Sequence, residues 1–269
     1  RGDADVNAGL RPHAALRLDA GRAAPREEWT IEETPVALLY NGLSFAVMMA
    51  TPTDLEDFAL GFALGEGIVE RPAEFALVDV VRGERGVALH AAIPQARFDA
   101  LEGRRRNLEG RSGCGLCGAE SLEAALRPLP GVAPGPRIAP ARILAAFEAL
   151  ARAQPLNDRC GGAHAAAFLV DDALLVREDV GRHNAVDKAI GALHRATPPM
   201  RPGDGLLAVT SRASYEIVAK AARAGVAVVA TVSAPTDLAI RTAEAANVTL
   251  VAFVRDGRMN VYSGRERLA

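Results

Sequence analysis

The chain of 269 residues has no apolar run long enough to cross a membrane. A transmembrane helix needs about 18 consecutive apolar residues, whereas the longest candidate, residues 225–232, is only long enough for a strand. The first residues do not form a secretory signal either, because charged side chains interrupt every apolar stretch before Asp19. We therefore expect no membrane association.

Cysteine and lysine are both scarce. The three cysteines are too few, and odd in number, for a disulfide framework, which favours reduced, reactive thiols and a cytoplasmic location. Among 31 basic residues only Lys188 and Lys220 are lysines, and 33 acidic residues leave a net charge of -2. Without an excess of positive charge, no nucleic-acid partner is expected. A Walker A motif is also absent, which excludes the common P-loop for nucleotide phosphates.

The chain does have the composition of a globular protein, with 49% hydrophobic and 24% charged residues. Its length suits one large α/β domain or two smaller ones. Composition shifts divide it into four parts. These are a poorly ordered tail (1–26), a β-rich segment ending in a CxxC loop and a helix (27–127), a proline- and glycine-rich connector (128–140) and an α/β domain (141–269).

In the β-rich segment, Asn41-Gly42 between apolar runs predicts a hairpin. Thr53 followed by Glu56 predicts a capping box that begins a helix reaching Leu64. Further strands are expected at 29–33, 75–81 and 86–93, and a loop at 104–118 before a helix at 119–126. In the α/β domain, the sequence predicts a hairpin at 163–177 and helices at 141–153, 185–195, 215–224 and 237–246. It also predicts strands at 206–210 and 226–232 and a final strand at 248–255. This alternation predicts a partly parallel sheet covered by helices.

The pair Cys114-Gly115-Leu116-Cys117 lies in a loop between glycines and just before the expected helix. Nearby arginines and the N–H groups of a helix start would stabilise a thiolate there, suited to carrying a persulfide or exchanging disulfides. Alternatively the pair is half of a zinc site that Cys160 and His164 complete, or it is inert. The spacing leaves these alternatives open.

Polar residues also follow several expected strands. The stretch 177–188 is densely charged, 210–214 and 233–236 carry hydroxyls, and two arginines flank the turn after the last strand. Ligands of open α/β sheets bind at the carboxyl ends of strands, where helix N-termini attract anions. A phosphate-bearing, nucleotide-like ligand is plausible on these grounds. The plainer alternative for 177–188 is a helix N-terminus that Asn184 caps, with solvated charges.

Taken together, these motifs resemble the formate dehydrogenase accessory sulfurtransferase family (FdhD), over residues 34–264. The segments that carry the resemblance are Cys114 to Gly118, Gly161 to Ala167, Glu178 to Lys188, Arg212 to Glu216 and Ser233 to Pro235.

The resemblance implies a cytidine-deaminase-like α/β/α sandwich with a smaller, mostly β N-terminal segment. It also implies a sulfurtransferase: a cysteine desulfurase loads a persulfide onto Cys114, with Cys117 assisting. The sulfur then passes to the bis-molybdopterin guanine dinucleotide form of the molybdenum cofactor, bound as substrate, for use in formate dehydrogenase. A homodimer is expected as well.

Family pattern and strand-end chemistry together nominate the residues expected to hold this cofactor. They are Phe253, Val254, Arg255, Asp256, Gly257, Arg258, Asp179, Arg182, His183, Arg212, Ser214 and Ser233. The alternatives are a cofactor chaperone that performs no chemistry and a structural zinc protein.

Overall fold

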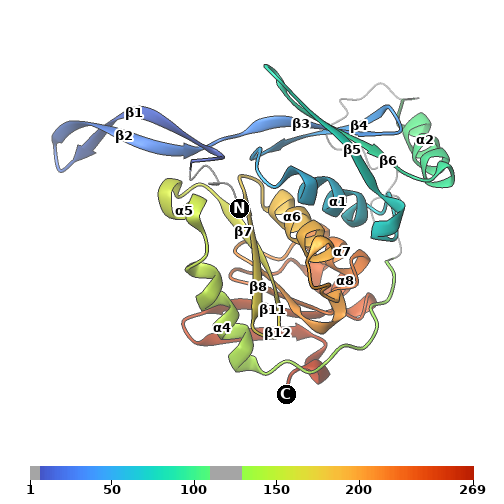
Figure 1. Cartoon of the computed structure of the whole chain (residues 1–269). Helices are drawn as coiled ribbons and strands as arrows, with labels where there is room; N and C mark the ends of the chain where they lie inside the picture. The colour runs from blue at the N-terminus through green and yellow to red at the C-terminus, as the bar shows by residue number, and fades with distance from the viewer. Residues whose placement is uncertain (1–6, 110–128) are drawn as a thin grey trace.

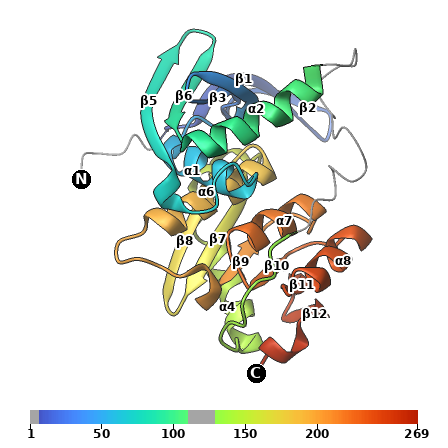
Figure 2. The same cartoon turned by 90° about the vertical axis from the view of Figure 1, so that its right-hand side faces the viewer.

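The computed structural model describes residues 7–109 and 129–269, without the side chains of 104–109. These residues form a mixed α/β architecture with three sheets. Figure 2 shows the layers, from a four-stranded sheet through helices α1 and α6 to a six-stranded sheet.

The N-terminal part begins with a β-hairpin. Strands β1 (Leu10–Asp19) and β2 (Arg22–Ile31) pair antiparallel along their whole length. The expectation of a poorly ordered tail over 1–26 is therefore wrong from Leu10 onwards. Successive residues of each strand alternate between the two faces of the hairpin, which is the sequence pattern of a β-strand. Alanine, proline and arginine make this pattern weak in the sequence.

The four-stranded sheet has the strand order β4-β3-β6-β5. Its strands are β3 (Thr34–Tyr40), β4 (Leu43–Ala50), β5 (Ala76–Gly83) and β6 (Gly86–Ala92). The predicted Asn41-Gly42 turn is confirmed, since both residues have positive φ between β3 and β4.

Two helices accompany this sheet, α1 (Leu55–Gly65) and α2 (Gln95–Glu109). The predicted capping box is wrong, because Asp54 occupies the N-cap of α1 and no side chain caps it. Instead the hydroxyl of Thr53 accepts a hydrogen bond from Lys188 at 3.4 Å. The expected loop at 104–118 is wrong as far as Glu109, which α2 includes, and the helix expected at 119–126 lies outside the described residues.

The six-stranded sheet has the order β12-β11-β10-β9-β7-β8. Strands β9, β10 and β11 are parallel, while β7 and β12 run antiparallel to their neighbours. Its strands are β7 (His164–Val170), β8 (Ala173–Asp179), β9 (Leu206–Val209), β10 (Val228–Thr231), β11 (Thr249–Arg255) and β12 (Arg258–Ser263). The helices are α4 (Pro140–Ala151), α5 (Pro155–Cys160), α6 (Arg182–Arg195), α7 (Tyr215–Arg223) and α8 (Asp237–Ala245).

Most of the predicted alternation is confirmed, including the hairpin of β7 and β8. Two elements differ: the sequence analysis missed α5, and β12 follows the strand expected to be final. Short 3-10 turns occur at Pro72–Glu74, Pro202–Asp204 and Arg265–Arg267. Figure 1 shows α4 on one face of the sheet and α6, α7 and α8 on the other.

Two glycines allow helices α1 and α6 to pack closely against each other. Helices α1 and α6 pack so closely that a Cβ at Gly61 would lie 1.7 Å from the Asp187 carbonyl oxygen. A Cβ at Gly191 would likewise lie 1.9 Å from the carbonyl oxygen of Asp57. Only glycine permits this approach, and the contact holds α1, with the sheet above it, against the six-stranded sheet.

Candidate functional site

The polar strand ends predicted from the sequence meet at one edge of the six-stranded sheet. Because β9, β10 and β11 are parallel, their carboxyl ends lie at the same edge. Strand β8 also ends there, and antiparallel β7 begins there with His164 opposite Asp179. Helices α6, α7 and α8 start just beyond these strands, so their N-terminal N–H groups face the same region. This edge is the candidate site.

The tight turn from β11 to β12 forms one end of the site. Phe253, Asp256 and Gly257 all have positive φ, so the ladder is irregular between Ala252 and Arg255. The guanidinium of Arg255 lies 5.8 Å from the centre of the Phe253 ring. The arrangement presents an aromatic ring and an exposed cation together, which suits a nucleotide.

Not every predicted residue of this turn is available. The Val254 side chain is only 2% exposed and belongs to the core. Asp256, Gly257 and Arg258 are exposed, with 3.8 Å between the Arg258 guanidinium and the Asp256 carboxylate. The backbone N–H of Phe253 donates to the Ser233 carbonyl oxygen at 3.3 Å, which joins the turn to the end of β10.

Two histidines lie in the middle of the edge. His183 Nε2 is 3.3 Å from the Ser214 hydroxyl and 3.8 Å from a Glu216 carboxylate oxygen. Burial, reinforced by the nearby Arg182 guanidinium, lowers the pKa of His183. The same two causes lower the pKa of His164. Both imidazoles are therefore biased toward the neutral form, in which one ring nitrogen accepts a proton or hydrogen bond.

The arginines of the site differ in their surroundings. Arg182 is half-buried, and its Nε is enclosed without a hydrogen-bond partner among the described residues. Arg212 and Ser233 are exposed, whereas Ser214 is buried. Helix α6 starts after Gly181, so the prediction that Asn184 caps it is wrong. Asn184 instead lies inside the helix and donates to the Met49 carbonyl oxygen at 2.8 Å.

Asp179 does not face a ligand, contrary to the sequence-based expectation. Its side chain is completely buried, and one carboxylate oxygen lies 2.7 Å from the Lys188 ammonium. It also accepts hydrogen bonds from the N–H groups of Thr51 and Gly181 and from the Asn184 amide. These four donors occupy the acceptor capacity of a carboxylate, so Asp179 organises the turn rather than contacting a cofactor.

The two lysines of the chain are both buried in ion pairs. Lys188 also donates to the Thr51 carbonyl oxygen at 2.9 Å, which ties the end of β4 to α6. Lys220 lies 2.8 Å from Asp187 and 2.7 Å from Glu66. Burial raises the pKa of Asp187 to about 6 even though Lys220 opposes the shift. The sequence analysis missed these pairs. The one sequence feature that could have indicated these buried ion pairs is the rarity of lysine in an arginine-rich chain.

Comparison with known proteins connects this geometry to a family. The FdhD/NarQ family model matches residues 31–269. The chain belongs to the FdhD/NarQ family. A relative from Xanthomonas campestris pv. campestris (strain B100), named sulfur carrier protein FdhD, is 50% identical over 265 residues, covering 96% of this chain and 94% of the relative. A protein of the same name from Bordetella petrii is 48% identical over 259 residues, covering 95% and 92%.

A solved structure has the same fold. The crystal structure of a putative formate dehydrogenase accessory protein from Desulfotalea psychrophila superposes with a TM-score of 0.73 at 25% sequence identity. The match covers 97% of this chain and 99% of that protein. The similarity therefore extends over nearly the whole chain and is not confined to the motifs.

Among the cysteines of this FdhD/NarQ member, Cys114 and Cys117 lie outside the described residues. Cys160 ends α5 and is half-buried, and its sulfur accepts a hydrogen bond from the N–H of Gly162 at 3.3 Å. Within residues 7–109 and 129–269, no three His, Cys, Asp or Glu side chains form a group that could hold a metal ion. This leaves the four-ligand zinc hypothesis untested, because two of its ligands lie outside those ranges.

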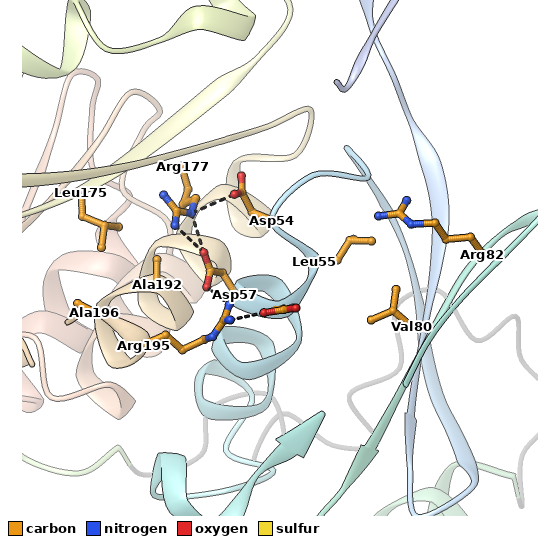
Figure 3. A pocket seen from close by; sticks show the side chains of 11 residues that line it. Asp54, Leu55, Asp57, Val80, Arg82, Leu175, Arg177, Ala192, Arg195 and Ala196 are labelled. Atoms are coloured by element: carbon orange, nitrogen blue, oxygen red, sulfur yellow. Dashed lines mark hydrogen bonds and ion pairs between the residues drawn. The ribbon is translucent and has the colours of Figure 1, made fainter. Parts of the chain in front are cut away.

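A cleft of about 730 Å³ lies elsewhere, between α1, β5, β8 and α6. Asp57 binds Arg177 and Arg195 at 2.7 and 2.6 Å at its centre, and Arg82 of β5 lies across the cleft (Figure 3). None of the cofactor-binding residues predicted from the sequence lines it. In the part of the chain that the structure describes, no helix is long and apolar enough to span a membrane.

Proposed function

We propose that this chain is a sulfur carrier that supports formate dehydrogenase and works as a sulfurtransferase. The observation that carries the proposal is 50% identity, over nearly the whole chain, to a protein named sulfur carrier protein FdhD. The CxxC pair of Cys114 and Cys117 supports it, because a carrier needs a thiolate that accepts and releases sulfur.

The chemistry has two steps. A cysteine desulfurase passes one sulfur atom to the Cys114 thiolate, which becomes a persulfide. The Cys117 thiolate then attacks the Cys114 sulfur, and the outer sulfur leaves with the electron pair of the broken bond as sulfide. The two cysteines are left as a disulfide, as after attack by a resolving thiol. The sulfide becomes the terminal ligand of molybdenum in the substrate cofactor.

The proposed binding place for that cofactor, bis-molybdopterin guanine dinucleotide, is the edge of the six-stranded sheet. Support comes from the exposed Arg212, Arg255 and Arg258 and from three helix N-termini, which suit the phosphates of a dinucleotide. The Phe253 ring and Arg255 suit a base. A cytidine-deaminase-like α/β/α sandwich is the proposed fold, supported by helices on both faces of this sheet.

The proposed partners are a cysteine desulfurase and formate dehydrogenase, and the chain is proposed to act in the cytoplasm as a homodimer. Three cysteines in 269 residues support a reducing compartment. The name of the solved relative, a putative formate dehydrogenase accessory protein, supports the second partner.

Mass spectrometry of the intact chain, after incubation with a desulfurase and cysteine, tests the proposal. The chain should gain the mass of one sulfur atom, and Cys114→Ala should lose that gain while Cys160→Ala retains it. A wild-type chain that gains no sulfur would overturn the carrier function. Full loading of Cys114→Ala would overturn the role of Cys114, and stoichiometric zinc in the purified protein would favour a structural metal site.

A further inference from the structure

His183, Ser214 and Glu216 form a connected polar group in the middle of the edge. His183 lies in the first turn of α6, and its Nε2 is 3.3 Å from the Ser214 hydroxyl. Ser214 is the N-cap residue of α7, but its side chain makes no capping hydrogen bond, so the hydroxyl is available to its neighbours. A carboxylate oxygen of Glu216 lies 3.8 Å from the same imidazole nitrogen. We call these three side chains the His183 cluster.

The hydrogen bonds of the His183 cluster fix which imidazole nitrogen carries the proton. Burial raises the pKa of Glu216, but hydrogen bonds from the Ser214 hydroxyl and the Glu216 N–H outweigh burial and leave that pKa below its usual value. A hydroxyl has a single proton, and Ser214 gives it to this carboxylate, so the Ser214 oxygen accepts from His183. The proton of the neutral imidazole is therefore on Nε2, and Nδ1 keeps its lone pair. Among the described residues, none donates a hydrogen bond to Nδ1, which is available as a base.

Sulfur release, as proposed above, needs a proton to move. Cys117 attacks as a thiolate, yet a cysteine thiol with an ordinary pKa of about 8.5 is mostly protonated at pH 7. The outer sulfur of the Cys114 persulfide is already an anion, so without a proton it would leave as a doubly charged sulfide. A leaving group of lower pKa leaves faster, and hydrosulfide is therefore much the better leaving group. Moving one proton from the Cys117 thiol to the outer sulfur meets both needs.

We infer that His183 carries this proton from the attacking thiol to the departing sulfur. Its Nδ1 takes the proton of Cys117, the Cys117 sulfur bonds to the Cys114 sulfur, and the bond to the outer sulfur breaks with its electron pair on that atom. The imidazolium then returns the proton to the outer sulfur. The products are the disulfide, one hydrosulfide ion and neutral His183, so the transferred sulfur is reduced as the two cysteines are oxidised. This role rests on the proposed function and adds a catalytic residue to it, with Ser214 and Glu216 as positioning residues.

The position of His183 matches the place where the sulfur has to be released. Hydrosulfide diffuses away unless it forms beside the molybdenum that accepts it, so release belongs at the edge proposed to bind the cofactor. Two other titratable groups at this edge are less suited to the task. The Asp179 carboxylate already accepts four hydrogen bonds, and within the described residues no hydrogen bond orients the ring of His164.

The charged groups that face His183 come from three helices and leave its imidazole neutral at pH 7. Burial lowers the pKa of His183, and the guanidinium of Arg182 on α6 lowers it further. On α7, Glu216 raises this pKa and Lys220 lowers it, and Glu66 at the end of α1 raises it. The pKa remains below its usual value, so the resting ring is ready to accept a proton. Once the ring is protonated, Glu216 and Glu66 stabilise the imidazolium until the proton is passed on.

Single-turnover sulfur release, followed by mass spectrometry of the intact chain, tests this role. The chain is loaded with a cysteine desulfurase and cysteine, freed of both, and mixed with molybdenum cofactor. His183→Gln and His183→Ala should load as wild type does but lose the sulfur adduct at least about a hundredfold more slowly, because general acid–base catalysis is removed. His194→Gln removes an imidazole from the last turn of the same helix, away from the edge, and should release sulfur as wild type does.

Two measurements separate proton transfer from a structural effect. Added imidazole should speed sulfur release by His183→Ala in proportion to its concentration and leave the wild-type rate unchanged. Ser214→Ala should slow release about tenfold because the ring loses its hydrogen-bond partner, whereas Ser214→Thr keeps the hydroxyl and should retain the wild-type rate.

Wild-type release rates in both His183 variants would overturn the role of His183, as would a slow His183→Ala that imidazole does not accelerate. Slow release confined to His164→Gln would also overturn it. A wild-type chain that never gains sulfur would instead overturn the proposed function, because loading precedes release and does not involve His183.

Discussion

Replacing Lys188 by methionine should destabilise the protein strongly. Lys188 and Asp179 are both fully buried and 2.7 Å apart, and methionine has nearly the same length without the charge. The variant leaves the Asp179 carboxylate buried and unpaired and removes a donor from the Thr51 carbonyl oxygen. Removing one member of a buried pair costs about 3–5 kcal/mol. At about 2–4 °C per kcal/mol for a chain of this size, the melting temperature should fall by roughly 6–20 °C.

Calorimetry or urea unfolding measures this loss directly. Arg241→Ala is the matched control, because it breaks an exposed ion pair with Asp237 and should cost less than about 0.5 kcal/mol. Adding Asp179→Asn to Lys188→Met should recover part of the loss, since the stranded charge is gone. If Lys188→Met costs no more than Arg241→Ala, the reasoning that this pair holds the β8–α6 turn is refuted.

Three further outcomes are expected. Burial raises the pKa of Asp187 from 3.8 to about 6, so between these pH values the native protein binds more protons than the unfolded chain. The stability that this extra proton binding contributes is therefore full below pH 4 and is lost as the pH rises through 6. Asp187→Asn should therefore remove a decline of about 3 kcal/mol from urea unfolding profiles between pH 4 and 7, and an unchanged slope would contradict the shift. Gly191→Ala should lower the free energy of unfolding, measured by thermal unfolding, by about 2–3 kcal/mol or more, because the new Cβ meets the Asp57 carbonyl oxygen. The control Gly103→Ala has open space around its Cβ and should stabilise α2 by about 0.5–1 kcal/mol. Arg258→Ala should weaken calorimetric binding of guanosine diphosphate, a probe for the dinucleotide end of the cofactor, by about tenfold or more, while Arg241→Ala leaves it unchanged.

The part of the fold that sequence predicts well is the α/β region from β9 to β11. There, strands with uninterrupted apolar residues alternate with amphipathic helices over short loops, so strand order and direction follow from general rules. Parallel direction then brings the polar ends at Arg212, Ser233 and Phe253 to one edge. That gathering was predictable because it depends on topology and not on side-chain detail.

The rest depends on contacts between distant segments. Gly61 and Gly191 show no pattern of their own, and only the packing of α1 against α6 explains why neither has a side chain. Asp179 stands among other charged residues in the sequence, yet it is buried. Its carboxylate accepts from the distant Thr51 as well as from Gly181, Asn184 and Lys188 of the following segment. The β1–β2 hairpin was missed because small residues and arginines hide its alternation.

The most direct test of the sulfur-carrier account is a single-turnover transfer. The chain is loaded with radioactive sulfur, separated from the desulfurase, and incubated with molybdenum cofactor and formate dehydrogenase that lacks the terminal sulfur ligand. We predict that the label leaves the chain in proportion to the formate dehydrogenase activity that develops, and that the Cys114→Ala, Cys117→Ala double variant supports neither. Equal activation by that double variant would contradict the account and identify the chain as a cofactor chaperone without sulfur chemistry.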